Sequence, residues 1–212
     1  MDVVVAGGHG RVALRLLELL AARGDRARGL IRNPDHAADL EQVGAEPVLC
    51  DMEAEDDLAP FVEGADAVVF AAGAGPGSGP ERKKTVDLGA AVKLIEAAER
   101  RDITRYVMVS AIGAGDPASA PPAMRPYQEA KGEADARLQR SGLAWTIVRP
   151  GGLTNDPGSG RIRAGQDIGT GTIPREDVAA TLAAVLAAPN TIGVTFDVIA
   201  GDVPIADAVA VL

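Results

Sequence analysis

The sequence predicts a doubly wound α/β fold, in which helices cover both faces of a parallel sheet. Three observations indicate it. Short apolar runs alternate with amphipathic stretches along the 212 residues, a glycine loop follows the first apolar run, and glycine-rich segments follow several later ones. Near-continuous apolar strands separated by helices are typical of a parallel sheet that is buried on both faces. Right-handed crossovers then bring the loops after the strands to one ligand-binding edge.

Each apolar run is interpreted as a strand and each amphipathic stretch as a helix. The first helix places Val12, Leu16, Leu19 and Leu20 on one face, and Gly24 stands where a helix-ending glycine is expected. The expected strands cover 3–6, 27–31, 46–50, 65–72, 106–109, 144–148 and 195–199. The expected helices cover 11–23, 34–43, 56–62, 86–101, 126–141 and 175–188. Glycine-rich loops are expected at 73–80, 113–126 and 155–174, each after a strand.

Length and composition exclude several classes of protein. Residues 1–212 fit one domain, in which loops 113–126 and 155–174 and the C-terminal tail form the substrate side. A net charge of −9 with 3% aromatic residues argues against nucleic-acid binding. No apolar run reaches the roughly 18–20 residues of a membrane span, and the N-terminus lacks the basic segment of a signal peptide. With a single cysteine, these features predict a cytoplasmic protein that does not bind membranes.

No metal site is expected. One cysteine excludes a disulfide framework and a cysteine-based zinc site. His9 and His36 are the two histidines, and neither has the spacing of a metal ligand. The acidic residues between 51 and 57 are interpreted as a solvated first helical turn rather than as metal ligands.

The loop after the first strand has the pattern Gly7-x-x-Gly10-x-x-Ala13 and leads directly into a helix. A phosphate approaches a backbone closely only where no Cβ blocks it, and a helix N-terminus offers free N–H groups and a positive dipole end. A tight turn without a ligand is the alternative. In this position, between the first strand and the first helix, the pattern favours a dinucleotide. The cofactor-binding residues expected here are Gly7, Gly8, His9, Gly10, Arg11 and Val12.

The end of the second strand indicates which dinucleotide is bound. An acid there would bind the ribose hydroxyls of NAD, whereas an arginine favours the 2′-phosphate of NADP. The strand ends in Arg32, and no acid follows until Asp35. Arg32, with Arg11 as a second candidate, therefore predicts NADP(H) in preference to NAD(H), although both could be ordinary solvated arginines. Asp51 and Met52 follow the third strand, where an adenine would lie; a helix N-cap is the alternative role for Asp51.

Tyr127 and Lys131 stand four residues apart, and so share one face of the helix at 126–141. A tyrosine is a useful proton donor or acceptor when its pKa falls well below about 10, and a neighbouring ammonium lowers that pKa. Lys131 could also bind the nicotinamide ribose. Ser110, after the fifth strand, could hold a substrate oxygen beside the tyrosine hydroxyl. Chance spacing is the alternative.

Further motifs recur along nearly the whole chain. They are the Gly7-x-x-Gly10 loop, the segments 31–34, 87–88 and 106–110, Tyr127-x-x-x-Lys131, and the segments 146–151, 173–179, 191–193 and 201–202. Together they resemble the atypical short-chain dehydrogenase/reductase superfamily. The resemblance is strongest to small bacterial NAD(P)-binding proteins described as NmrA-like or NAD-dependent epimerase/dehydratase-like.

This resemblance implies a Rossmann-like fold and assigns roles to individual residues. Ser110, Tyr127 and Lys131 would be catalytic, Ala71, Ala72 and Gly73 would line the adenosine side, and Pro150 and Gly151 would form a wall at the nicotinamide. The chain departs from the pattern in three ways. No threonine precedes the first glycine, the asparagine of the central helix is replaced near Asp87, and the region after the sixth strand is short. The substrate pocket is therefore expected to be small, open or completed by another subunit of a homodimer.

Three functions remain open at this stage. The first is an NADPH-dependent oxidoreductase acting on a small carbonyl compound or alcohol, with Tyr127 as general acid in reduction. The second is a non-enzymatic NADP(H)-sensing regulatory protein, as NmrA-like relatives suggest. The third is a flavin or quinone reductase, which would not need Tyr127 or Lys131.

Overall fold

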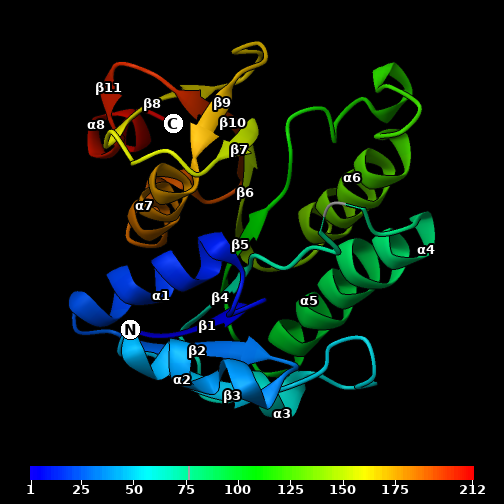
Figure 1. Ribbon diagram of the computed structural model, residues 1–212, viewed down its shortest axis with the longest axis vertical. Coiled ribbons are helices and arrows are strands. Elements are labelled where there is room, and N and C mark those ends of the chain that lie inside the picture. Colours follow the sequence, from blue (N-terminus) through cyan, green and yellow to red (C-terminus); the bar gives the residue numbers. More distant parts are fainter. Residues whose placement is uncertain (76) are drawn as a thin grey trace.

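The computed structural model of the protein describes residues 1–75 and 77–212. Its centre is a nine-stranded sheet in the order β11-β8-β10-β6-β5-β4-β1-β2-β3 (Figure 1). The strands β1, β2, β3, β4, β5, β6 and β10 pair in parallel. They cover Asp2–Ala6, Arg26–Ile31, Glu46–Leu49, Ala67–Phe70, Arg105–Val109, Ala144–Pro150 and Val194–Ala200. The strand order reverses between β1 and β4, which is the switch point where such sheets bind ligands. The predicted Rossmann-like fold is confirmed.

Beyond β10 the sheet continues with two strands that the sequence did not predict, β8 and β11. The segment 155–174, expected as a loop, contains β8 (Arg161–Gly165), which pairs antiparallel with β10, and β9 (Thr172–Pro174). β9 pairs with β7 (Gly152–Thr154) in a separate two-stranded sheet. The C-terminal tail adds β11 (Val203–Pro204) beside β8. β8 alternates exposed arginines with the buried Ile162, a half-buried pattern that the surrounding glycines conceal in the sequence.

Helices cover both faces of the sheet, and β1 shows how the two cores divide. Val3 and Val5 pack on one face, with α1 (Arg11–Ala22), α7 (Arg175–Leu186), α8 (Ile205–Ala210) and Leu40 of α2 (Ala37–Gln42). Val4 and Ala6 pack on the other. That second face is covered by α3 (Ala59–Val62), α5 (Ala91–Arg100) and α6 (Arg125–Gln139). Successive side chains of a strand point to opposite faces, so one apolar run serves both cores.

Several helix boundaries differ from those expected. The helix expected at 86–101 is a π-helix, Lys83–Ala90, followed by α5 and preceded by the short α4 (Pro80–Arg82). The helix expected at 34–43 begins as a 3₁₀ turn, Pro34–His36, and two further 3₁₀ turns cover Pro117–Ser119 and Pro189–Thr191. α3 begins only at Ala59, so the acidic residues 51–57 precede it and do not form its first turn. The glycine-rich segment 73–80 includes Pro76, which lies outside the described residues.

The buried face of α1 matches the predicted one at three of four positions. Leu17, rather than the expected Leu19, joins Val12, Leu16 and Leu20 in the buried stripe, and Leu19 is 41% exposed. Gly24 has φ +87°, and its N–H donates to the carbonyl of Ala21. This is the left-handed ending that glycine permits.

Residues 1–75 and 77–212 contain neither a membrane-spanning helix nor a cluster of metal ligands. No helix there has the length and apolar character needed to cross a membrane. In the same ranges, no group of three His, Cys, Asp or Glu side chains could hold a metal ion.

Candidate functional site

The three glycines of the loop between β1 and α1 have different tasks. Gly7 has φ +78°, and a Cβ there would lie 2.8 Å from the Cα of Ala72. The N–H of Gly10 donates to the carbonyl of Gly7 at 2.7 Å, and a Cβ on Gly10 would lie 3.0 Å from that same oxygen. A Cβ on Gly8 would lie 2.8 Å from the Cα of Gly29 in β2. Gly7 and Gly10 therefore shape an open turn at the start of α1, whereas Gly8 is needed for packing against β2.

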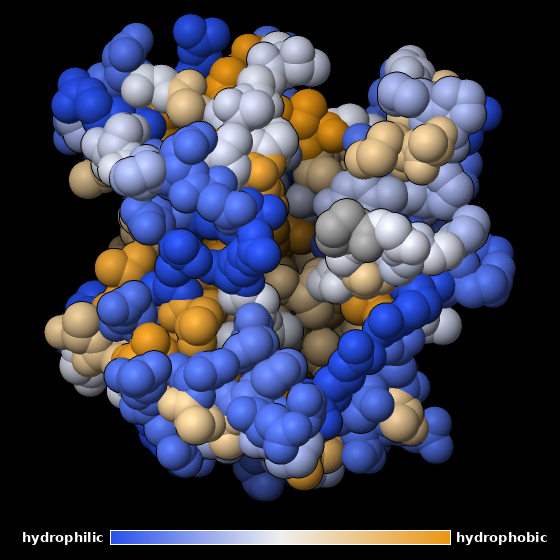
Figure 2. Space-filling model, in the orientation of Figure 1, coloured by the Kyte–Doolittle hydropathy of each residue, from blue (hydrophilic) through white to orange (hydrophobic). Residues whose placement is uncertain are grey.

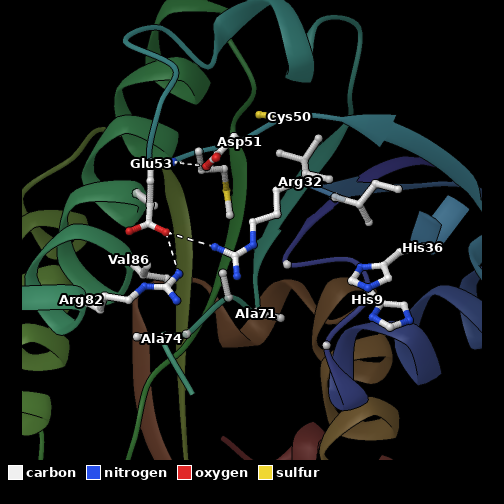
Figure 3. Close-up of a pocket in the computed structure, with 18 residues that line it drawn as sticks. His9, Arg32, His36, Cys50, Asp51, Glu53, Ala71, Ala74, Arg82 and Val86 are labelled. Carbon is white, nitrogen blue, oxygen red and sulfur yellow. Dashed lines mark hydrogen bonds and ion pairs between the residues drawn. The ribbon is translucent and has the colours of Figure 1, made fainter. Parts of the chain in front are cut away.

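A pocket of about 340 Å³ lies beside this loop, where β1, β2, β3 and β4 end (Figure 3). It is lined by many of the residues expected to bind the cofactor, namely Gly7, His9, Gly10, Arg32, Asp51, Met52, Ala71, Ala72 and Gly73. The other residues expected to do so, Gly8, Arg11, Val12, Lys131, Pro150 and Gly151, are not part of its lining. The pocket thus includes Ala71, Ala72 and Gly73, expected on the adenosine side, and leaves out Pro150 and Gly151, expected at the nicotinamide, together with part of the glycine loop.

Arg32 shares a carboxylate with an arginine that the sequence analysis missed. Glu53 Oε2 lies 3.4 Å from Arg32 Nη1 and 2.7 Å from Arg82 Nη2 (Figure 3). Thr85 donates a hydrogen bond to Glu53 Oε1 at 2.8 Å. Partial burial alone would raise the pKa of Glu53, but the hydrogen bonds from Thr85 and Arg82 and the charges of both arginines lower it. Two arginines of the pocket lining therefore share one carboxylate.

Two stacked imidazole rings form another part of the lining. The rings of His9 and His36 have centroids 3.6 Å apart and are 13° from parallel, as Figure 3 shows. His9 Nε2 lies 2.7 Å from Asp39 Oδ2. Asp51, also in the lining, accepts a hydrogen bond from the N–H of Glu53 at 3.0 Å. This contact closes a local turn rather than capping a helix.

On the inner face of α6, Lys131 is paired with a buried carboxylate. Its Nζ lies 3.4 Å from Asp87 Oδ1 and donates to the carbonyl oxygens of Val109 at 3.1 Å and Ala72 at 3.4 Å. Both side chains of the pair are buried. Burial lowers the pKa of Lys131, whereas the charges of Asp87 and Asp135 raise it. Ala72 also lines the pocket, so Lys131 lies next to its wall.

Ser110 is also already hydrogen-bonded. Its Oγ donates to Asp135 Oδ2 at 2.8 Å, and the same oxygen lies 2.9 Å from Arg149 Nη2. Burial raises the pKa of Asp135, while Arg149 and Ser110 oppose that change. Asp135 follows Lys131 by four residues on the same helix face. The periodicity that singled out Tyr127 and Lys131 could have identified it.

The electrostatic expectation for Tyr127 was wrong. Its pKa is raised, first by burial and then by the charges of Asp87 and Asp135. Lys131 does not reverse this, because its ammonium lies against Asp87 and two carbonyl oxygens. The Nζ of Lys83 lies 5.2 Å from the centre of the Tyr127 ring. The phenol is therefore neutral at ordinary pH.

Arg11 and Gly151 lie outside the pocket lining, and each makes a contact with another segment. Arg11 Nη1 donates to Asn155 Oδ1 at 3.2 Å, so Arg82, and not Arg11, shares a partner with Arg32. Gly151 follows β6, and a Cβ there would lie 2.3 Å from the carbonyl oxygen of Gly171. Gly151 thus permits the close approach of the segment that leads into β9.

Comparison with known families decides the class. Residues 7–189 match a family model described as NAD(P)H-binding. The chain belongs to this NAD(P)H-binding family. The matched range includes the glycine loop, the pocket and the inner face of α6. The glycine loop and the arginines also suit a dinucleotide, since a Cβ at Gly7 or Gly10 would fill the turn and the arginines offer charge to phosphate.

Relatives of this NAD(P)H-binding chain extend over its full length. The Bacillus subtilis protein YhfK, named as an uncharacterized sugar epimerase, is 41% identical over 210 residues, which are 98% of each chain. A solved structure from Bacillus halodurans, provisionally named an NAD-dependent epimerase/dehydratase, is 40% identical with a TM-score of 0.96 over 100% of both chains. The Lactococcus lactis oxidoreductase ylbE is 27% identical with a TM-score of 0.90, covering 100% of this chain and 96% of its own.

Proposed function

We propose that this protein is an NADPH-dependent oxidoreductase that reduces a small carbonyl compound, with Tyr127 as the proton donor. The observation that carries the proposal is the contact between Lys131 and the pocket. Lys131 Nζ lies 3.4 Å from the carbonyl oxygen of Ala72, a residue of the pocket lining. Lys131 therefore adjoins the wall of the pocket, and Tyr127 stands one helical turn before it on the same face of α6. Bound NADPH would supply the hydride.

The pocket charges support NADP(H) over NAD(H). Arg32 and Arg82 carry two positive charges against the one negative charge of Glu53. An arginine fork binds phosphate with two parallel hydrogen bonds, and such charge-assisted bonds are stronger than neutral ones. A 2′-phosphate would find two guanidinium groups there, whereas a bare ribose hydroxyl would find no comparable partner in them.

The state of Tyr127 supports reduction rather than oxidation. A phenol with a raised pKa keeps its proton at neutral pH, so it can donate a proton to a developing alkoxide. Oxidation of an alcohol would need the same group to accept a proton first. Two relatives have epimerase names, and an epimerisation that starts by oxidising an alcohol would meet the same obstacle. Reduction is therefore the direction that Tyr127 favours.

The two tyrosines provide a matched test. Tyr127→Phe should lower NADPH consumption with an active carbonyl compound by about 10²–10⁴-fold, the usual contribution of a general acid, with NADPH affinity unchanged. Tyr106→Phe is the control, because the Tyr106 hydroxyl is buried and lacks a hydrogen-bond partner among the described residues. The measurement is NADPH absorbance against a panel of small aldehydes and ketones. Unchanged turnover in Tyr127→Phe would remove the assignment.

A second candidate, an NADP(H)-sensing protein without catalysis, is favoured by one observation. Lys131 lies in ion-pair distance of the buried Asp87, and Ser110 donates a hydrogen bond to the buried Asp135, so both side chains have partners within the fold. Under this alternative, Tyr127→Phe would leave every measured property unchanged. Cofactor redox state would instead change the affinity for a protein partner. Equal partner affinity with no cofactor, with NADP and with NADPH would exclude the sensor.

A further inference from the structure

Three arginines gather where the N-termini of α1 and α7 lie together. Arg11 and Arg175 are the first residues of these two 12-residue helices, and Arg15 stands one turn into α1. Arg11 Nη1 lies 3.2 Å and Arg175 Nη1 lies 2.8 Å from the same atom, Asn155 Oδ1. Arg175 Nη1 also donates to the carbonyl of Leu153 at 3.3 Å. Two guanidinium groups thus converge on one neutral oxygen.

The charges in this cluster are not balanced. Arg15 lies 3.6 Å from Glu176 Oε1, and Glu176 also accepts the N–H of Gly158. In residues 1–75 and 77–212, no carboxylate lies within ion-pair distance of Arg11 or Arg175. Partial burial, followed by the charges of Arg11 and Arg15, lowers the pKa of Arg175. Like charges held together without an acid repel each other unless an anion joins them.

The surroundings favour a ligand over two ordinary solvated arginines. The whole chain has a net charge of −9, so an unbalanced positive cluster is not part of a general excess of cations. Helix N-termini add partial positive charge and free N–H groups. Figure 2 shows the molecule hollowed between its α1–α7 side and its α4–α6 side, with strongly hydrophilic residues gathered on the α1–α7 side. Arg32 is not part of the cluster, since its ion-pair partner is Glu53.

We propose that Arg11, Arg175 and Asn155 form an anion site that takes a phosphate or carboxylate group. An incoming anion would accept hydrogen bonds from both guanidinium groups, while the amide of Asn155 would keep the two side chains together. The group could belong to the pyrophosphate of the dinucleotide or to an acidic second substrate, since both present the same oxygen chemistry. The site binds its anion whether or not Tyr127 takes part in a reduction.

Two variants and a control test this site without removing the fold. Asn155→Asp keeps the shape of the side chain and places a negative charge between the arginines. Arg175→Ala removes one of them. Arg140→Ala is the control, because Arg140 is an exposed arginine after the last turn of α6. Each protein is titrated calorimetrically with NADP, adenosine 2′-phosphate and inorganic phosphate, the last with and without saturating NADP.

The titrations separate the two sources of the anion. If the anion is the pyrophosphate, Asn155→Asp and Arg175→Ala weaken NADP binding by about tenfold or more, while adenosine 2′-phosphate binds as before. If the anion belongs to a substrate, NADP binding stays unchanged in every protein. The wild-type protein and Arg140→Ala then bind inorganic phosphate, whereas Asn155→Asp and Arg175→Ala do not. Either result supports the site. Affinities for NADP and phosphate within about twofold in all four proteins would overturn it, as would a wild-type protein that binds neither. A wild-type protein that binds phosphate but not NADP would contradict the proposed function alone.

Discussion

The pocket beside the glycine loop and the buried face of α6 satisfy their charges in opposite ways. In the pocket, Arg32 and Arg82 are partly exposed and share a single carboxylate, Glu53. On α6, Lys131 is buried against Asp87, and Asp135 is buried against Ser110 and Arg149. In the pocket, two exposed arginines therefore share one carboxylate, with Asp51 as a second acid of the lining, whereas each buried charge of the α6 face has its own partner of opposite sign.

This difference separates binding from chemistry. An exposed arginine pair can accept a phosphate at small cost, because water and one carboxylate are its existing partners. Buried pairs cost several kcal/mol when one member is removed, so the α6 face is a rigid part of the fold. We infer that cofactor affinity can be tuned in the pocket, whereas changes to the buried pairs Lys131–Asp87 and Asp135–Arg149 lower the stability of the fold first.

The largest effect is expected from breaking the buried pair of Lys131 and Asp87. Lys131→Met should lower the free energy of unfolding by about 3–5 kcal/mol, because it leaves the buried carboxylate without its cation. Lys84→Met is the control, since Lys84 is exposed and pairs with Glu81 on the surface, and should cost under about 1 kcal/mol. Urea denaturation measures both.

Adding Asp87→Asn to Lys131→Met should recover part of the loss, because the buried negative charge is then removed as well. If Lys131→Met and Lys84→Met have the same free energy of unfolding, the pair of Lys131 and Asp87 does not stabilise the fold.

A change in pH dependence is expected next, from Asp87→Asn. In the wild-type protein the raised pKa of Tyr127 keeps its proton until the pH passes above its ordinary value of 10.0. The rate of carbonyl reduction should therefore show no loss from Tyr127 below that pH. Asp87→Asn removes one charge that raises this pKa and releases Lys131 toward the ring, so the alkaline fall in kcat/KM should move to lower pH.

The control for this profile is Asp66→Asn, on the exposed loop before β4. In Asp66→Asn, the alkaline fall in kcat/KM should occur at the same pH as in the wild-type protein. If kcat/KM of the wild-type protein already falls near pH 7, Lys131 lowers the pKa of Tyr127, which would contradict this account.

A small effect is expected in the pocket from Glu53→Gln. The substitution keeps a side chain that Thr85 and Arg82 can contact, and it raises the net charge of the arginine cluster by one. NADP should bind tighter by under about 1 kcal/mol, and NAD should change less. Fluorescence titration with NADPH and NADH measures this. Weaker NADPH binding would mean that Glu53 positions the arginines rather than competing for them.

The fold could be predicted from the sequence because its signals are local. Apolar runs, the glycine loop and Gly24 each fix a strand, a turn or a helix end with neighbouring residues alone. The strand β8 was missed because Arg161, Ile162 and Arg163 give only a short alternation between glycines. The π-helix before α5 has no pattern that distinguishes it from an ordinary helical start.

The candidate site was predictable only in part, because its charges meet in space. Arg32 could be identified from its place after a strand, but Glu53 and Arg82 reach it from two other segments. The spacing of Tyr127 and Lys131 indicated a shared helix face. It could not indicate that Asp87, from the π-helix, holds the ammonium. Nor could it show that burial, and then the charges of Asp87 and Asp135, raise the pKa of Tyr127.

The central claim is that the exposed arginines of the pocket bind the 2′-phosphate of NADPH and so favour NADPH over NADH. The most direct measurement is the pair of dissociation constants for NADPH and NADH in the wild-type protein and in Arg32→Ala, with Arg140→Ala as the control. We expect Arg32→Ala to lose about 1.5–3 kcal/mol of binding free energy for NADPH and much less for NADH. Equal losses for the two cofactors would contradict the claim.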